Sequence, residues 1–219
     1  MVGALGERVE PSWFVVLHYR EPTYGLRPER RERDIGLEDV KPVVDEVIRL
    51  GGQVVRIGQP GMHPLRERER LIDFSEQPFL MQACAVSRAR FFLELTPSGP
   101  ASLASAFGTP RLRTNSVNLE GPLDDRGIVV PQRVVDNQGN DVTERALQKD
   151  FLNERTVEKM PGLAFRKNSL DQVFEAVSLM VDKTARTGGW RIPDVPRLAN
   201  PPGRLLWPVP MRYRHKILV

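Results

Sequence analysis

The chain has 219 residues, 40% of them hydrophobic and 27% charged, which suffices for one large domain or two small ones with a sizeable core. Its net charge of +4 comes from scattered basic residues with only 7% aromatics, which argues against nucleic acid as a partner and suits phosphorylated small molecules or an anionic membrane surface. No apolar run approaches a membrane span, no signal peptide is expected, and Cys84 is the only cysteine, so a cytoplasmic location without internal disulfides is predicted.

Two apolar strands with a helix between them form the first unit predicted along the chain. The runs Trp13–Leu17 and Gln53–Ile57 are typical of buried strands, and Leu37–Leu50 carries valines at helical spacing before two glycines. A strand, helix and strand in this order predict parallel strands joined by a right-handed crossover. The charged segment Thr23–Gly36 is predicted to be a mobile loop, either a solvated connection or a flap over a ligand.

Polar residues follow each of these two strands directly. His18, Arg20 and Glu21 follow the first strand, and a loop rich in glycine and proline, Gly58–Leu65, follows the second. In open α/β sheets, ligands bind at the carboxyl ends of the strands. His18 is therefore either a ligand or acid-base group or a hydrogen-bonded structural residue, and Glu21 is expected to orient Arg20 rather than act as a base.

A short strand at Leu71–Phe74 and a helix at Gln77–Arg88 come next. The apolar residues of this helix predict an inward face that includes Phe79 and Leu80, with Cys84 as a small core residue. These elements continue the alternation of strands and helices.

The stretch Ser87–Asn115 predicts a strand, a polar loop, a short helix and a second strand. Phe91–Leu93 is a compact apolar run, Ala101–Phe107 has apolar residues at helical spacing, and Leu112–Thr114 follows as a strand. The loop Thr96–Pro100 between the first strand and the helix can bind a phosphate, because free N–H groups and the helix dipole favour an anion there. The alternative is an ordinary turn with a serine cap.

The order of elements up to Asn115 is β-α-β-β-α-β-α-β, which predicts an α/β fold with a doubly wound, mostly parallel, Rossmann-like sheet. Beyond it, Ile128–Pro131 and Arg133–Val135 are predicted as short strands or extended segments. A polar helix is expected from Thr143 to about Asn153, and an amphipathic helix with a serine cap at Leu170–Thr184. Residues 1–184 are predicted to form one Rossmann-like domain, followed by an extended, proline-rich tail, 185–219, that wraps the domain or docks on a partner.

Four segments occur in a defined order: LHYREP, VVRIGQPGMHPL, LIDFSE and FFLELTPSGPASLASAFGTPRLRTNS. Together they resemble a family of bacterial GT-B glycosyltransferases associated with cell-surface polysaccharide genes. The resemblance covers roughly Trp13 to Thr184. Two positions depart from the family pattern, because Phe74 replaces the usual tyrosine and Gln59 stands where an acidic residue is common.

The resemblance implies the C-terminal, donor-binding half of a GT-B enzyme, which uses a nucleotide-diphosphate sugar and needs no metal or other cofactor. The acceptor half is then expected from a partner chain, or transferase activity is absent and the chain is a non-catalytic nucleotide-binding or protein-interaction subunit. The loops and the resemblance together give catalytic candidates His18, Arg20 and Glu21 and substrate-binding candidates Arg56, Gly58, Pro60, Met62, Asp73, Thr96, Ser98, Gly99, Pro100, Thr114 and Asn115.

Such a transferase must neutralise a departing diphosphate, which helix N-termini and arginines can do without a metal. The Ser98-Gly99 helix start and Arg20 are the leading candidates, and Arg56 is either a third or a salt-bridged residue beside its strand. The three histidines and single cysteine show no ligand spacing for zinc. The expected partners are a nucleotide sugar and either a second chain or another copy of this chain, with peripheral membrane association as an option. Besides a transferase donor domain and a non-catalytic subunit, a third hypothesis for the function is a phosphosugar-processing enzyme.

Overall fold

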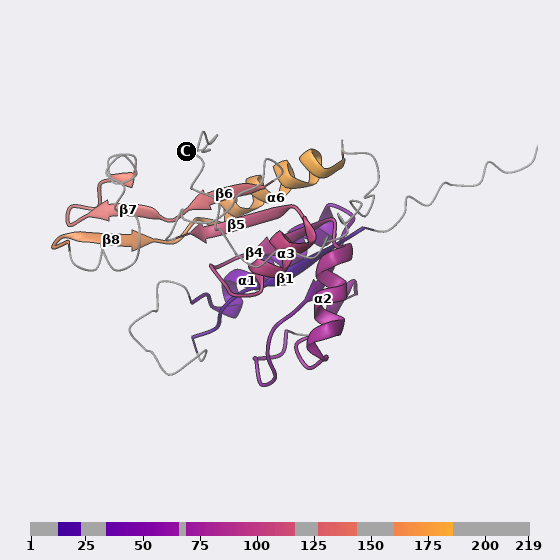
Figure 1. Ribbon diagram of the computed structural model, residues 1–219. Helices are drawn as coiled ribbons and strands as arrows, with labels where there is room; N and C mark the ends of the chain where they lie inside the picture. Colours follow the sequence, from indigo (N-terminus) through magenta and orange to yellow (C-terminus); the bar gives the residue numbers. More distant parts are fainter. Residues whose placement is uncertain (1–12, 23–33, 66–68, 117–126, 144–159, 186–219) are drawn as a thin grey trace, which may run out of the picture.

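The computed structural model describes residues 13–22, 34–65, 69–116, 127–143 and 160–185 (Figure 1). A six-stranded sheet with the order β3-β2-β1-β4-β5-β6 forms its centre, and every neighbouring pair is parallel. Its strands are β1 (Phe14–His18), β2 (Gln53–Arg56), β3 (Leu71–Asp73), β4 (Phe91–Glu94), β5 (Arg111–Ser116) and β6 (Ile128–Pro131). The predicted doubly wound, Rossmann-like sheet is confirmed.

Helices cover both faces of this sheet, as the alternation along its strands requires. The helices are α1 (Leu37–Arg49), α2 (Phe79–Arg88), α3 (Ala101–Phe107) and α6 (Leu170–Ala185). Val15 and Leu17 of β1 pack with the buried residues of α1 and α6, whereas Val16 between them packs with those of α2 and α3. Successive strand residues point to opposite faces, so one continuous apolar run supplies two separate cores.

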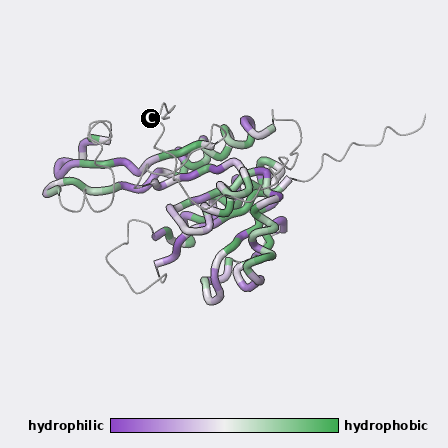
Figure 2. The backbone as a smooth tube through the Cα atoms, in the orientation of Figure 1, coloured by the Kyte–Doolittle hydropathy of each residue, from purple (hydrophilic) through white to green (hydrophobic). Residues whose placement is uncertain are grey.

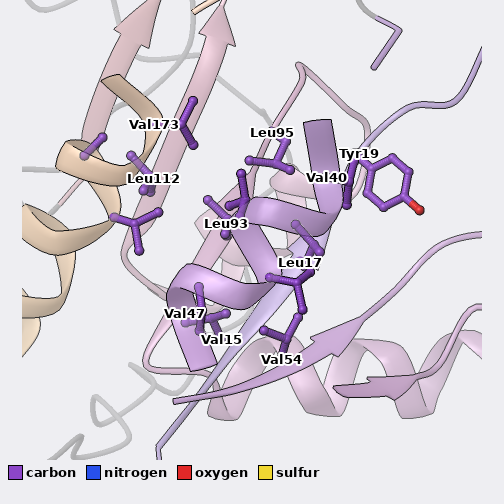
Figure 3. Close-up of a cluster of buried hydrophobic side chains, with 14 of the residues drawn as sticks. Val15, Leu17, Tyr19, Val40, Val47, Val54, Leu93, Leu95, Leu112 and Val173 are labelled. Atoms are coloured by element: carbon purple, nitrogen blue, oxygen red, sulfur yellow. The ribbon is translucent and has the colours of Figure 1, made fainter. Parts of the chain in front are cut away.

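The larger core lies between the sheet and the α1–α6 layer (Figure 3). Val40 and Val47 of α1 meet Leu17 and Leu93 of the central strands, and Val173 of α6 lies beside Leu112 of β5. Figure 2 shows the hydrophobic stretches concentrated where the sheet and its helices pack together.

Helix ends follow the predicted local signals. Gly108 ends α3 in the left-handed conformation (φ 68°), and its N–H bonds back to the last turn. Ser169 and Gln172 form a capping box before α6, with Gln172 Oε1 accepting from the Ser169 N–H at 3.0 Å and Ser169 Oγ accepting from the Gln172 N–H at 3.3 Å.

The expectation for α2 was wrong in its first turn. Phe79 and Leu80 are 70% and 71% exposed, and Cys84 is exposed rather than a core residue. The buried residues of α2 are Ala83, Ala85 and Val86. Only the second half of this helix therefore packs on the sheet, which leaves the large side chains of its first turn in solvent.

A two-stranded antiparallel arm extends from the main sheet (Figure 1). β7 (Arg133–Asp136) continues β6 past the carboxyl edge and pairs with β8 (Leu163–Arg166), a strand that the sequence analysis did not predict. Most of the predicted helix from Thr143 to Asn153, most of the loop Thr23–Gly36 and residues 186–219 of the predicted tail lie outside the described residues, so those predictions stand untested. Ala185, predicted as the first residue of the tail, is instead the last residue of α6.

Candidate functional site

The candidate site lies at the carboxyl ends of the parallel strands, where β1 and β4 are neighbours. His18 is paired in register with Glu94 at these ends. The helix after β1 packs on one face of the sheet and the helix after β4 on the other, so the connecting loops diverge at this point. Such a switch point is where open α/β sheets form their ligand crevice.

Arg56, at the end of β2, is the centre of a buried ion network. Its side chain is 0% exposed, and Nη2 donates to Glu21 Oε1 at 2.9 Å while Nη1 donates to Asp73 Oδ2 at 2.9 Å. Nη1 also donates to the His63 carbonyl at 2.8 Å, and the guanidinium carbon lies 5.1 Å from the centre of the Tyr19 ring. The structure therefore supports the structural reading of Arg56, because its charge is shared between two carboxylates.

Glu21 faces Arg56 and His63 instead of Arg20. Its Oε2 accepts from the His63 backbone N–H at 3.0 Å and lies 2.8 Å from His63 Nδ1. Its side chain is 3% exposed, whereas that of His63 is 58% exposed. The expected Glu21–Arg20 pairing was wrong, because the loop after β2 folds back over Glu21.

Arg20 pairs with a residue that the sequence analysis did not single out. Its Nε lies 2.9 Å from Asp34 Oδ1, with side chains 13% and 9% exposed. Its backbone N–H donates to Thr96 Oγ1 at 2.9 Å, and Thr96 is fully buried. This bond ties the loop after β1 to the loop after β4 across the switch point.

His18 and Tyr19 are buried between these loops. Burial, and to a smaller extent the nearby Arg56 cation, together lower the pKa of His18 to about 4, so the imidazole is neutral at pH 7. Its Nδ1 is buried without a hydrogen-bond partner among the described residues. Burial raises the pKa of the Tyr19 hydroxyl well above its ordinary value, so it stays protonated.

The Ser98–Gly99 loop already holds a carboxylate. Glu94, 0% exposed at the end of β4, accepts from the Ser98 N–H at 2.8 Å through Oε1 and from Arg113 Nε at 2.7 Å through Oε2. Pro100 precedes the first residue of α3, and a Cβ on Gly99 would meet no atom within 4 Å. An incoming anion thus has open space at Gly99, but the Ser98 N–H is already bonded to the Glu94 carboxylate.

The Gly58–Leu65 loop lies over the end of β2 and contacts α2. The Gly58 N–H donates to Gln82 Oε1 at 3.0 Å, and the Met62 sulfur occupies the space that a Cβ on Gly58 would need. Pro60 is exposed, and Gly61 has a φ of 83° that favours glycine. Only glycine therefore fits at position 58 unless Met62 moves, while most of the loop is exposed.

Thr114 and Asn115 lie at the same edge on β5, but their side chains serve internal bonds. Thr114 Oγ1 and Asn115 Nδ2 donate to the Leu95 carbonyl at 3.2 and 2.9 Å. Asn115 and Asn168 also pair reciprocally, each backbone N–H donating to the other's Oδ1 at 2.6 and 2.8 Å. This pair fixes the end of β5, where Asn115 has a positive φ of 49°, to the start of α6.

The sequence-predicted residues thus fall into separate groups rather than one cluster. The groups are Glu21, Arg56 and Asp73; Arg20 and Thr96; Ser98 and Gly99; Gly58, Pro60 and Met62; and Thr114 and Asn115. The sequence did not single out Asp34, Glu94 and Asn168, and it pointed to a surface position for His63 but not to its contact with Glu21. Glu94 carried a signal, since a charged residue inside the apolar run FFLEL must find a partner.

Within the described ranges, no group of three or more His, Cys, Asp or Glu residues could hold a metal ion. No helix there is long and apolar enough to span a membrane. Neither finding bears on residues outside those ranges.

The fold is an open α/β domain with a switch point at the carboxyl edge of its sheet. No protein-family model and no curated protein sequence matches the chain. Among solved structures, it is similar to a glycosyl transferase family 9 protein from Veillonella parvula DSM 2008, with 17% identity and a TM-score of 0.49 over 78% of this chain and 46% of that one.

It is also similar to the ADP-heptose lps heptosyltransferase II of E. coli, with 14% identity and a TM-score of 0.49 over 80% of this chain and 48% of that one. The dodecameric iron-containing heptosyltransferase TibC, solved with ADP-D-beta-D-heptose, is 15% identical, with a TM-score of 0.43 over 82% of this chain and 46% of that one. The chain spans about half the length of these proteins. With every TM-score below 0.5, no property of theirs follows for this chain.

Proposed function

We propose that this chain binds a nucleotide-diphosphate sugar at the carboxyl edge of its sheet and serves as the donor half of a glycosyltransferase of the cell-surface polysaccharide type. The observation that carries the proposal is the switch point between β1 and β4, where the Arg20 backbone is bonded to Thr96. The family-like segments of the sequence fall on the loops around this point. The acceptor site would come from a partner chain or a second copy, and the reaction would run without a metal in the cytoplasm.

Open space at Gly99 gives a diphosphate room to approach the backbone before α3. The three arginines described at this edge, Arg20, Arg56 and Arg113, each have a carboxylate partner. Arg56 is completely buried, so of the three, Arg20, next to the switch point and 13% exposed, is best placed to exchange its partner for a ligand. A diphosphate that approaches the Gly99 backbone would therefore compete with Asp34 for Arg20.

A second candidate is a non-catalytic protein-interaction subunit. Phe79, Leu80 and Met81 are exposed at the start of α2, which follows the carboxyl edge of β3, and large apolar side chains in solvent often mark contact surfaces. The Glu94 carboxylate in the Ser98 loop also disfavours an anion there. Both observations would fit a chain whose edge contacts a polypeptide rather than a nucleotide.

A thermal-shift measurement separates the two candidates. We expect one of UDP, GDP, CDP, dTDP or ADP to raise the Tm, by the linkage between binding and unfolding, and Gly99→Val to abolish that shift. Gly99 is exposed with free space around it, so the variant should keep the Tm of the unliganded wild type. No shift with any nucleotide, together with co-purification of another polypeptide, would favour the interaction subunit.

A further inference from the structure

His63 is fixed at three points, although its ring faces solvent. Its backbone N–H and Nδ1 both meet Glu21 Oε2, at 3.0 and 2.8 Å, and its carbonyl accepts from Arg56 Nη1 at 2.8 Å. The loop around it is held as well, because the Gly58 N–H donates to Gln82 and the Gly61 N–H to Glu76. The imidazole is thus exposed but held in place.

These contacts set the tautomer of the ring. An ionised carboxylate only accepts hydrogen bonds, so the ring nitrogen facing Glu21, Nδ1, carries the proton. In the neutral imidazole, Nε2 then has a free lone pair. The side chain is 58% exposed and its Nδ1 faces a carboxylate that is only 3% exposed, so we infer that the exposed part of the ring is the side away from Nδ1, which carries Nε2.

The carboxylate behind the ring is itself held by a cation. Glu21 is 3% exposed, and its other oxygen receives Arg56 Nη2 at 2.9 Å. A buried carboxylate that orients an imidazole whose second nitrogen is accessible is the arrangement by which a histidine acts as a general base. His63 follows β2 and Glu21 follows β1, so the pair lies at the ligand edge of the sheet.

We propose that His63 is a catalytic base of this chain and that Glu21 is its positioning residue. The inference rests on the proposed glycosyl transfer, whose acceptor is a hydroxyl compound. The Nε2 lone pair takes the proton of the acceptor hydroxyl while its oxygen forms a bond to the anomeric carbon of the sugar. The bond from that carbon to the diphosphate oxygen breaks, and the nucleoside diphosphate leaves with the bonding electrons.

After this step the imidazole is cationic, and the Glu21 carboxylate beside Nδ1 stabilises it. His18, the other histidine at this edge, is unsuited to the task because it is only 8% exposed. His63 is therefore the one histidine among the described residues that an acceptor can reach.

A matched pair of variants tests this role. In His63→Asn, the amide nitrogen takes the place of Nδ1 and keeps the bond to Glu21, but nothing replaces Nε2; His63→Ala removes both. The assay follows hydrolysis of UDP-, GDP-, CDP-, dTDP- or ADP-glucose, with water as the acceptor, by the chain with any co-purified polypeptide. We expect kcat to fall about 100-fold or more in both variants, with KM and the nucleotide-induced Tm shift unchanged in His63→Asn.

Wild-type kcat in His63→Asn would overturn the inference and leave the proposed function intact. If no nucleotide sugar is bound or hydrolysed by the wild type, the proposed function fails and the inference falls with it. A second measurement does not depend on the variants: carbethoxylation of His63 by diethyl pyrocarbonate, followed by peptide mass spectrometry. A saturating nucleotide sugar should slow this reaction about tenfold, and an unchanged rate would show that His63 does not face the bound donor.

Discussion

Arg56 and Glu21 form an ion pair of 2.9 Å whose side chains are 0% and 3% exposed, between the ends of neighbouring strands β2 and β1. Asp73, at the end of β3, takes the other terminal nitrogen of the same guanidinium. One cation thus holds the carboxyl ends of three adjacent strands together. A buried pair of this kind contributes little over an apolar contact, but removing one partner leaves charges without compensation.

Arg56→Met should therefore destabilise the protein strongly. Methionine approximates the length of the arginine stem but deprives the Glu21 and Asp73 carboxylates of the guanidinium between them, and we expect a loss of about 3–5 kcal/mol in the free energy of unfolding. Arg49→Met is the matched control, because Arg49 is 67% exposed and its pair with Glu46 lies on the surface of α1. That substitution should leave the free energy of unfolding nearly unchanged, because an exposed ion pair contributes little. Equal losses in urea unfolding would contradict the structural role of Arg56.

His18 predicts a pH dependence of stability. Its pKa is about 4 in the folded protein against an ordinary 6.5, because burial and the Arg56 cation disfavour the imidazolium. Between these values the unfolded chain binds the proton and the folded chain does not, so stability rises with pH from about 4 to 6.5 and is lost on acidification. The contribution amounts to about 3 kcal/mol over this window.

The variant His18→Asn should lack this component. The measurement is the difference in unfolding free energy between wild type and variant at several pH values, in which the titration of groups common to both proteins cancels. A difference that shrinks by about 3 kcal/mol between pH 7 and pH 4 is expected. A difference that does not change with pH would mean that the pKa of His18 is the same in the folded and the unfolded protein.

The sheet could be predicted from the sequence because its strands are short apolar runs separated by helices with a clear apolar stripe. Phe91–Leu93 and Trp13–Leu17 gave strands to within one residue at either end, and Gly108 fixed the end of α3. The exposure of Phe79 and Leu80 could not be predicted in this way. Helical spacing shows which side chains share a face, but it does not show whether another layer lies beneath that face.

The placement of the candidate residues at one edge of the sheet could be predicted from the sequence, but their pairings could not. Side chains that follow parallel strands must share one edge, so the position of Arg20 and Glu21 at that edge followed from the strand order. Their partners depend on loop paths, which carry no periodic signal. The loop after β2 brings His63 back to Glu21, and the segment before α1 brings Asp34 to Arg20.

Arg20→Lys tests whether Arg20 contacts the departing diphosphate. Lysine keeps the charge but loses the planar fork that binds two oxygens at once. We expect kcat/KM for the nucleotide sugar to fall about tenfold, equivalent to about 1.4 kcal/mol of transition-state stabilisation. Asp34→Asn is the control, because it removes only the carboxylate that lies 2.9 Å from Arg20 Nε and should leave or raise activity. Unchanged turnover in Arg20→Lys would remove this residue from the mechanism.

Glu94→Gln tests the carboxylate that occupies the Ser98 loop. In the wild type the Ser98 N–H donates to Glu94 Oε1 at 2.8 Å, and glutamine keeps an oxygen that can accept this bond. The substitution removes the negative charge beside the proposed diphosphate site. It also leaves Arg113, whose side chain is 12% exposed, available to an incoming anion. We therefore expect the nucleoside diphosphate that stabilises the wild type to bind about tenfold more tightly, by about 1.4 kcal/mol, in isothermal titration calorimetry.

Ser98→Ala is the companion variant, since it removes the hydroxyl but keeps the backbone bond to Glu94. It should change the affinity much less than Glu94→Gln. If Glu94→Gln instead weakened nucleotide binding, the charge of Glu94 would be holding the loop and Arg113 in the binding geometry. The ion pair between Glu94 and Arg113 would then be part of the site that receives the ligand, and the repulsion argued above would be the smaller of the two effects.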